Sequence, residues 1–80
     1  MAETTLGDRI RMQRARLRMS QGELAKRIGI SLTSMNAIET GNVDPRASRI
    51  KKLAEVLGVS TDYLLGHGDE TEEILPAVAS

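Results

Sequence analysis

The alternation of apolar and polar positions along the chain predicts a series of short helices separated by glycines. Ile50, Leu53, Ala54 and Leu57 recur at the spacing of one face of an α-helix. Gly58 follows them, where a left-handed residue ends a helix at little steric cost. Read in this way, the whole chain is all-α, with helices expected over about residues 6–18, 20–28, 31–40, 47–57 and 60–65.

Several of these helices begin at side chains that can cap them. Thr5 with Asp8, and Ser20 with Glu23, have the spacing of capping boxes, in which each side chain accepts a hydrogen bond from the other residue's backbone N–H. Ser31 is an acceptable cap for the next helix. The helices that start at Ser20 and Ser31 are therefore expected to be short and adjacent in the chain.

The segment from Ser20 to Gly41 predicts two short helices set at a fixed angle. Gly29 ends the first helix, and Ile30 is an apolar residue that fills the turn. Met35 and Ile38 give the second helix an edge that faces inward. The apolar face of the first helix consists of Leu24, Ala25 and Ile28. Proteins use this geometry to place one helix in a DNA groove.

This order of caps, glycines and apolar positions resembles that of the phage repressor and Cro family, also called the xenobiotic-response-element class. Leu6, Ile10 and Leu17 resemble the family's first helix, and residues 53–66 resemble its last two. The resemblance covers roughly residues 6–66. It implies a compact five-helix repressor-like domain whose helix-turn-helix is formed by helices 2 and 3. It also implies a sequence-specific transcriptional regulator, a repressor that binds a palindromic operator as a homodimer without a cofactor.

The outward face of the second helix of the pair carries short or polar side chains without charge, which can approach base edges closely. We expect base contacts from Leu32, Thr33, Asn36 and Ala37. Asn36 is the strongest candidate, because its amide can pair bidentately with adenine; the alternative is a solvated side chain. Leu32 stands where the resembling repressors usually carry Gln, and it can pack on a thymine methyl, on Gln21 or on a neighbouring subunit.

Phosphate contacts are expected around this helix. Gln21 lies at a helix N-terminus whose backbone donors favour an anion, as the family's matching Gln does. Arg46 extends from the loop after the second helix, where the family places basic residues over the DNA backbone. Asn42 and Thr40 flank the same backbone, and Arg49 is a weaker second choice. Two subunits would bind half-sites one helical turn apart, about 34–36 Å.

The resemblance also implies an ion pair between Arg14 and Glu39, which would hold the second helix of the pair against the first helix of the domain. Treated as partly exposed, such a pair contributes only about 0–1 kcal/mol. The helix that carries Arg14 is rich in arginine. A solvated basic face is the structural alternative to a binding role for its other arginines: Arg9, Arg11, Arg16 and Arg18.

The formal net charge of zero hides an uneven distribution along the chain. Residues 1–68 hold all 11 basic residues and seven of the 11 acids, which leaves this part with a net charge of +4. Phosphate binding requires local positive potential and not a basic total. The chain therefore divides into a helix-turn-helix DNA-binding domain, residues 1–68, and an acidic C-terminal tail, residues 69–80, expected to be flexible or to contact a partner.

The composition also limits the function classes. There is no Cys, hence no disulfide framework and no thiolate metal site, and no window approaches the roughly 18 apolar residues of a membrane span. A soluble cytoplasmic protein is expected, with double-stranded DNA as partner and with no membrane, metal, cofactor or small-molecule substrate.

Two residues that could carry chemistry have plainer interpretations. His67 is isolated between glycines and is expected to be solvated, and Tyr63 is expected to be a half-buried core residue. Nothing assembles a nucleophile with a base, so no enzyme is expected. The alternative function is a protein-interaction or antitoxin-type module that uses the same fold, with the C-terminal arm as the partner contact.

Overall fold

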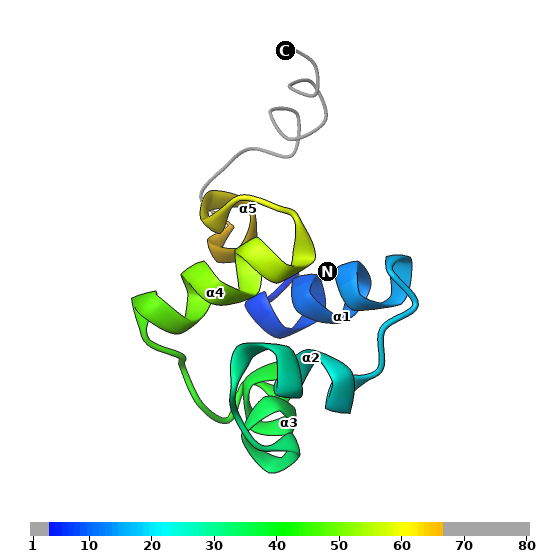
Figure 1. Ribbon diagram of the computed structural model, residues 1–80. Coiled ribbons are helices and arrows are strands. Elements are labelled where there is room, and N and C mark those ends of the chain that lie inside the picture. Colours follow the sequence, from blue (N-terminus) through cyan, green and yellow to red (C-terminus); the bar gives the residue numbers. More distant parts are fainter. Residues whose placement is uncertain (1–3, 67–80) are drawn as a thin grey trace.

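Five helices make up the part of the chain that the computed structural model describes, residues 4–66 (Figure 1). They are α1 (Leu6–Arg16), α2 (Gln21–Ile28), α3 (Leu32–Thr40), α4 (Ala47–Leu57) and α5 (Thr61–Leu65). The described residues contain no strand, and the all-α fold class is confirmed. Helix α1 crosses the middle of the molecule, with α2 and α3 at one end and α5 at the other (Figure 1).

Side-chain caps begin four of the five helices, as their sequence signals predict. The capping box of Thr5 and Asp8 is complete, with the backbone N–H of Asp8 donating to Thr5 Oγ1 at 3.1 Å and that of Thr5 to Asp8 Oδ2 at 3.2 Å. The bond from the Thr5 backbone is the main reason why the pKa of Asp8 lies below its usual value. The side chains of Ser31 and Ser60 cap α3 and α5 by accepting a hydrogen bond from the backbone N–H three residues on, without a returned bond.

The second expected capping box is only half formed. Ser20 accepts a hydrogen bond from the backbone N–H of Glu23 at 3.0 Å, but the Glu23 side chain does not return one to Ser20. Instead, Glu23 pairs with Arg27 one turn further on, at 2.9 Å. The capping box expected here is wrong because an i,i+4 partner of opposite charge is available to the carboxylate.

Glycines in the left-handed region end four helices, whereas α1 ends without one. Its last helical residue is Arg16, short of the expected Arg18, and Arg18 itself adopts a positive φ of 57°. The backbone N–H of Met19 then donates to the carbonyl of Arg14 at 2.9 Å and closes the turn. Leu17 lies beyond the last helical residue and is 39% exposed, so its expected place within the first helix is wrong.

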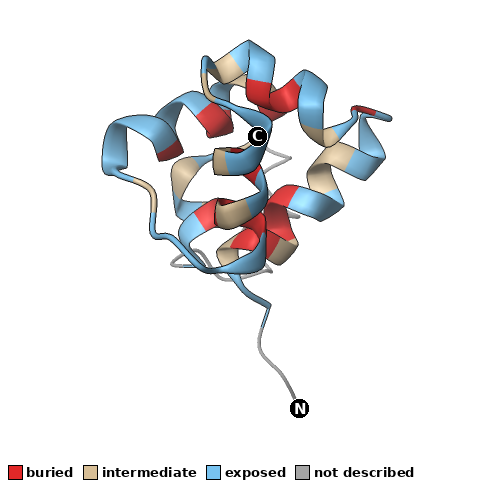
Figure 2. Ribbon diagram, turned by 90° about the horizontal axis from the view of Figure 1, so that it is seen from below, coloured by how far each residue is buried: buried red, intermediate tan, exposed pale blue. Residues whose placement is uncertain are grey.

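The core draws at least one fully buried side chain from every helix. Buried positions lie where the helices face one another (Figure 2). The largest fully buried side chains are Ile10, Leu24, Met35, Leu53, Leu57 and Leu64. Except for Leu64, all of them lie at positions that the periodicity of the sequence marks as apolar faces. Tyr63 and Ile30 pack against this core from its edge, as expected.

Arginines on α1 bind the carbonyl ends of other helices. Arg9 donates to the carbonyl of Tyr63 at 3.0 Å, and Arg11 donates to the carbonyl of Glu39 at 3.0 Å. Arg16 Nη2 lies 3.4 Å from the carbonyl of Leu57, at the end of α4. Cations are favourable at helix C-termini, where unpaired carbonyls carry partial negative charge. Arg9 is only 9% exposed and lies over the ring of Tyr63, so a solvated face is the wrong interpretation for it.

Gly7 allows α1 to pass directly over the end of α3. A Cβ atom placed on Gly7 would lie 2.0 Å from the carbonyl oxygen of Glu39, which is far shorter than any nonbonded contact that a Cβ atom makes in proteins. The obstacle is backbone and not a flexible side chain. The orientation of α3 relative to α1 therefore depends on a residue without a side chain at this position.

Replacing Gly7 by alanine is expected to destabilise the fold. The added methyl group forces α1 away from α3, which costs about 1–3 kcal/mol in unfolding free energy, less the gain in helix propensity. Gly22→Ala is the matched control, because it also lies in a helix and has no atom within 4 Å of the added Cβ. Urea denaturation of both variants is the measurement, and equal midpoints would contradict this account of the contact.

Candidate nucleic-acid interface

Helices α2 and α3 form the helix-turn-helix that the segment from Ser20 to Gly41 predicts. Gly29 is left-handed, with a φ of 79°, and the backbone N–H of Ile30 donates to the carbonyl of Ala25 at 3.0 Å. Ile30 packs against the core, which fixes the turn. Helix α3 consequently has one side held by α1 and α2 and another side open to solvent (Figure 1).

The open side of α3 carries the residues that sequence analysis predicts to contact bases. Leu32, Thr33 and Asn36 are exposed and Ala37 is half-buried, whereas the neighbouring Met35 is fully buried. Leu32 is 54% exposed, so it does not bury itself against α2 within one copy of the chain. No charged side chain interrupts this face, which leaves amide, hydroxyl and methyl groups to meet a ligand.

The ion pair between Arg14 and Glu39 is present and more deeply buried than a partly exposed pair. Arg14 Nε and Nη2 donate to the two carboxylate oxygens of Glu39 at 2.9 and 3.0 Å. The side chain of Glu39 is 1% exposed and that of Arg14 18%. Arg14 also donates to the carbonyl of Met19 at 3.1 Å, and Gln21 Nε2 adds a third bond to the carboxylate at 3.1 Å. The expectation of a partly exposed pair is therefore wrong for the carboxylate of Glu39.

A groove brings two of the four predicted base-contacting residues together with two of the five predicted phosphate-contacting residues. It encloses about 580 Å³ between α3, the loop that follows it and the start of α4. Thr33 and Ala37 line one side, and Arg46 and Arg49 line the other. The remaining lining residues are Ser34, Ile38, Val43, Asp44, Pro45 and Ser48. Val43 and Asp44 are not among the residues that the sequence predicts for this site, because loop residues follow no periodic pattern.

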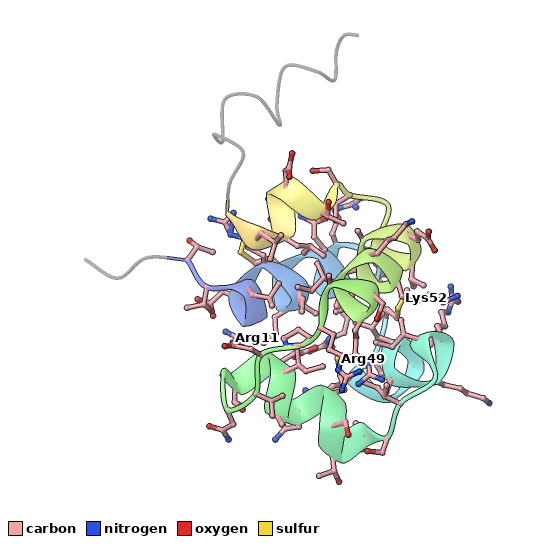
Figure 3. The ribbon with its side chains drawn as sticks, turned by 90° about the vertical axis from the view of Figure 1, so that its left-hand side faces the viewer. Arg11, Arg49 and Lys52 are labelled. Atoms are coloured by element: carbon pink, nitrogen blue, oxygen red, sulfur yellow. The ribbon has the colours of Figure 1, made fainter. Side chains whose placement is uncertain are left out.

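Positive charge flanks this groove. Arg46 and Arg49 are exposed, and Lys52 continues them along α4 at the same three-residue spacing. Figure 3 shows Arg49 between Arg11, which comes from α1, and Lys52. Arg11 is already paired with Asp8, whereas the three basic residues of the α4 side form no ion pair within residues 4–66. Lys52 could have been found from its spacing relative to Arg49.

Two of the other expected phosphate contacts already use their donors within the protein. The hydroxyl of Thr40 donates to the carbonyl of Asn36 at 2.9 Å, and Nε2 of the Gln21 amide donates to two acceptors on α3, at 3.1 Å and 3.4 Å. A phosphate oxygen accepts hydrogen bonds and does not donate them, so these two side chains can bind phosphate only with a donor that is not already used. The main-chain N–H at the start of α2 remains available at Gln21, and Asn42 is exposed.

The described residues include no group of three or more side chains suited to hold a metal ion. None of the helices within residues 4–66 has the length and apolar character that crossing a membrane requires. His67 and the acidic tail, residues 69–80, lie outside the described residues.

A helix-turn-helix family model matches residues 10–64, which is more than half of the chain. The chain therefore belongs to the helix-turn-helix family, in agreement with the resemblance carried by its caps and glycines. The match includes the whole of α2 and α3 together with the groove beside them.

Individual relatives come from bacteria and their phages. The HTH-type transcriptional regulator DicA of Escherichia coli is 36% identical over 74 residues, covering 92% of this chain and 54% of DicA. The cryptic phage CTXphi transcriptional repressor RstR of Vibrio cholerae is 36% identical over 70 residues, covering 85% of this chain and 62% of RstR. The chain thus spans a little over half the length of these relatives.

Solved structures resemble the fold closely. The P22 c2 repressor, crystallised with synthetic operator 9T, superposes with a TM-score of 0.77 at 30% identity, over 82% of this chain and 100% of that chain. The hypothetical transcription factor NHTF from Neisseria gives a TM-score of 0.77 at 30% identity, over 90% of this chain and 83% of that one.

The buried ion pair is expected to be strongly coupled. Arg14→Met and Glu39→Met should each lower the unfolding free energy by about 3 kcal/mol, because each leaves an unpaired charge with little access to water. The double variant should lose clearly less than the sum of the two. The exposed pair of Glu23 and Arg27, 45% and 53% exposed, is the control, with an expected coupling below about 0.5 kcal/mol. Chemical denaturation measures both cycles, and equal couplings would contradict the assignment.

Proposed function

We propose that this protein is a sequence-specific DNA-binding transcription regulator that represses by placing α3 in the major groove of an operator. The observation that carries the proposal is the open, uncharged face of α3, held by α1 and α2 beside a cationic groove. Helix α3 has nine residues, a length of about 14 Å that suits the major groove. The likeness to a repressor crystallised with its operator supports the same geometry.

Within this proposal, Leu32, Thr33, Asn36 and Ala37 contact base edges. Their methyl, hydroxyl and amide groups match the thymine methyl and the polar atoms that bases present in the major groove. The phosphate contacts would come from residues around this face that keep exposed donors: the main chain of Gln21, the side chains of Asn42, Arg46 and Arg49, and Thr40 where it exchanges its internal bond.

The proposal includes a homodimer on a palindromic site. The molecule measures 35 × 27 × 23 Å along its principal axes. Half-sites one helical turn apart place two copies about 34 Å from centre to centre, so neighbouring copies of this size would touch. The proposed division of the chain assigns residues 1–68 to this DNA-binding unit and leaves residues 69–80 as an acidic tail.

The base preferences of the protein are expected to depend on α3. Selection from a random duplex library should yield one preferred half-site for the wild type. Asn36→Ala and Thr33→Ala should each relax the preference at their own base positions, at a cost of about 1–3 kcal/mol in discrimination. An unchanged selected sequence in both variants would contradict the assignment of this face to base reading.

Arg46, at the groove, is expected to contact the phosphates of the DNA backbone and not the edges of the bases. Arg46→Ala should weaken all duplexes by a similar factor and reduce the slope of log affinity against log salt by about 0.9. Arg16→Ala is the control, because this arginine reaches the opposite end of α4, at the carbonyl of Leu57. Salt titrations of both variants test the difference, and equal slopes would exclude a phosphate contact at Arg46.

A further inference from the structure

A chain of hydrogen bonds leads from the half-buried Arg14 to the exposed Asn36. Arg14 donates to both carboxylate oxygens of Glu39, and the same carboxylate accepts a bond from Gln21 Nε2 at 3.1 Å. Gln21 Nε2 also lies 3.4 Å from Asn36 Oδ1. The four residues come from α1, α2 and α3, so this relay of Arg14, Glu39, Gln21 and Asn36 connects three helices.

The chemistry of the relay leaves one arrangement of the amides. A guanidinium only donates and a carboxylate only accepts, so Gln21 must turn its NH2 group, and not its carbonyl oxygen, towards Glu39. The second hydrogen of that NH2 group then meets an acceptor on Asn36, which is Oδ1. The Asn36 amide is thereby oriented with its Nδ2 group away from the relay. No hydrogen bond within residues 4–66 uses Asn36 Nδ2, and Asn36 is exposed.

We propose that Gln21 is a positioning residue that fixes the Asn36 amide as an outward donor, so that Asn36 selects base edges that present a keto oxygen. This inference rests on the proposed DNA-binding function and deepens it. Guanine presents O6 and N7 as acceptors in the major groove, and thymine presents O4. Cytosine presents an amino group there, and adenine presents an amino group beside its single acceptor N7, so an outward amide donor leaves these amino groups without an acceptor.

The bidentate contact with adenine that the sequence favours for Asn36 needs both polar atoms of the amide turned towards the base, with Oδ1 accepting from Gln21 and from adenine through its two lone pairs. It requires Oδ1 to accept from the adenine amino group while Nδ2 donates to N7. In the relay, Oδ1 already faces the NH2 group of Gln21. At the position read by Asn36, the operator is therefore expected to carry guanine or thymine in place of adenine.

The test compares three proteins on duplexes that vary at one position. Selection with the wild type and with Asn36→Ala first identifies the base position that Asn36 reads. Affinities for the four bases at that position are then measured for the wild type, for Gln21→Met and for Gln21→Lys. Methionine preserves length and helix propensity but donates nothing, whereas the lysine ammonium restores donors to both Glu39 and Asn36.

The wild type should prefer keto over amino bases at that position by at least about 5-fold, the lower end of a good base contact. Gln21→Met should bring the ratio to within about 2-fold, and Gln21→Lys should restore it. The preference at the position read by Thr33 is the internal control and should stay unchanged in Gln21→Met. Circular dichroism verifies that the variants are folded.

Three results would overturn the inference. They are a wild-type preference for adenine or cytosine at the Asn36 position, a keto preference that survives Gln21→Met but not Asn36→Ala, and a Gln21→Met variant that loses affinity equally for all four bases. A wild type that binds no duplex in the library would instead reject the proposed function itself, and with it this inference. The two failures are thus told apart by whether the wild-type protein binds DNA.

Discussion

The arrangement of the helices depends on the hydrogen bonds that the carboxylate of Glu39 accepts. This carboxylate lies at the end of α3, is almost completely buried, and accepts hydrogen bonds from Arg14 on α1 and from Gln21 on α2. A buried carboxylate is costly without partners, because it gives up its hydration. Its partners lie on two different helices, so the charge is satisfied only when α3 takes one orientation. The contacts of Glu39 with α1 and α2 therefore fix the direction in which the open face of α3 points.

Helix α1 supplies further contacts that complete this arrangement. Gly7 lets it approach the last turn of α3, and Arg11 binds the carbonyl of Glu39 at that end. Arg9, which is buried over the ring of Tyr63, donates in the same way to the carbonyl of Tyr63 on α5. The cations of α1 thus serve the fold, while the exposed cations beside the groove, Arg46 and Arg49, are left for a ligand. This division explains how a chain of zero net charge can present a cationic surface at one place.

Local features of the fold could be predicted from the sequence, and long-range contacts could not. Serine caps, left-handed glycines and apolar spacing act over a few residues, which is why the helices appear close to their expected bounds. The end of α1 was harder to predict, because Arg18 adopts the left-handed conformation without being a glycine. The burial of Arg9 and the close approach at Gly7 depend on residues more than thirty positions away, and no local pattern encodes them.

The candidate site shows the same division. The exposed positions of α3 follow from helical periodicity, and the pairing of Arg14 with Glu39 follows only from resemblance to a family. No sequence pattern predicts the bond from Gln21 to Asn36, because the sequence favours a phosphate contact for Gln21. The lining of the groove by Val43 and Asp44 depends on the path of a loop. Sequence periodicity therefore locates the face, while the orientation of each polar group on it requires the structure.

The most direct test of the account is a titration of the isotope-labelled protein with its selected duplex, followed through backbone amide chemical shifts. The large shifts are expected on the start of α2, on α3, on the loop of residues 41–46 and on the first turn of α4. Shifts concentrated on α5 and the far side of α1, with α3 unaffected, would contradict the account.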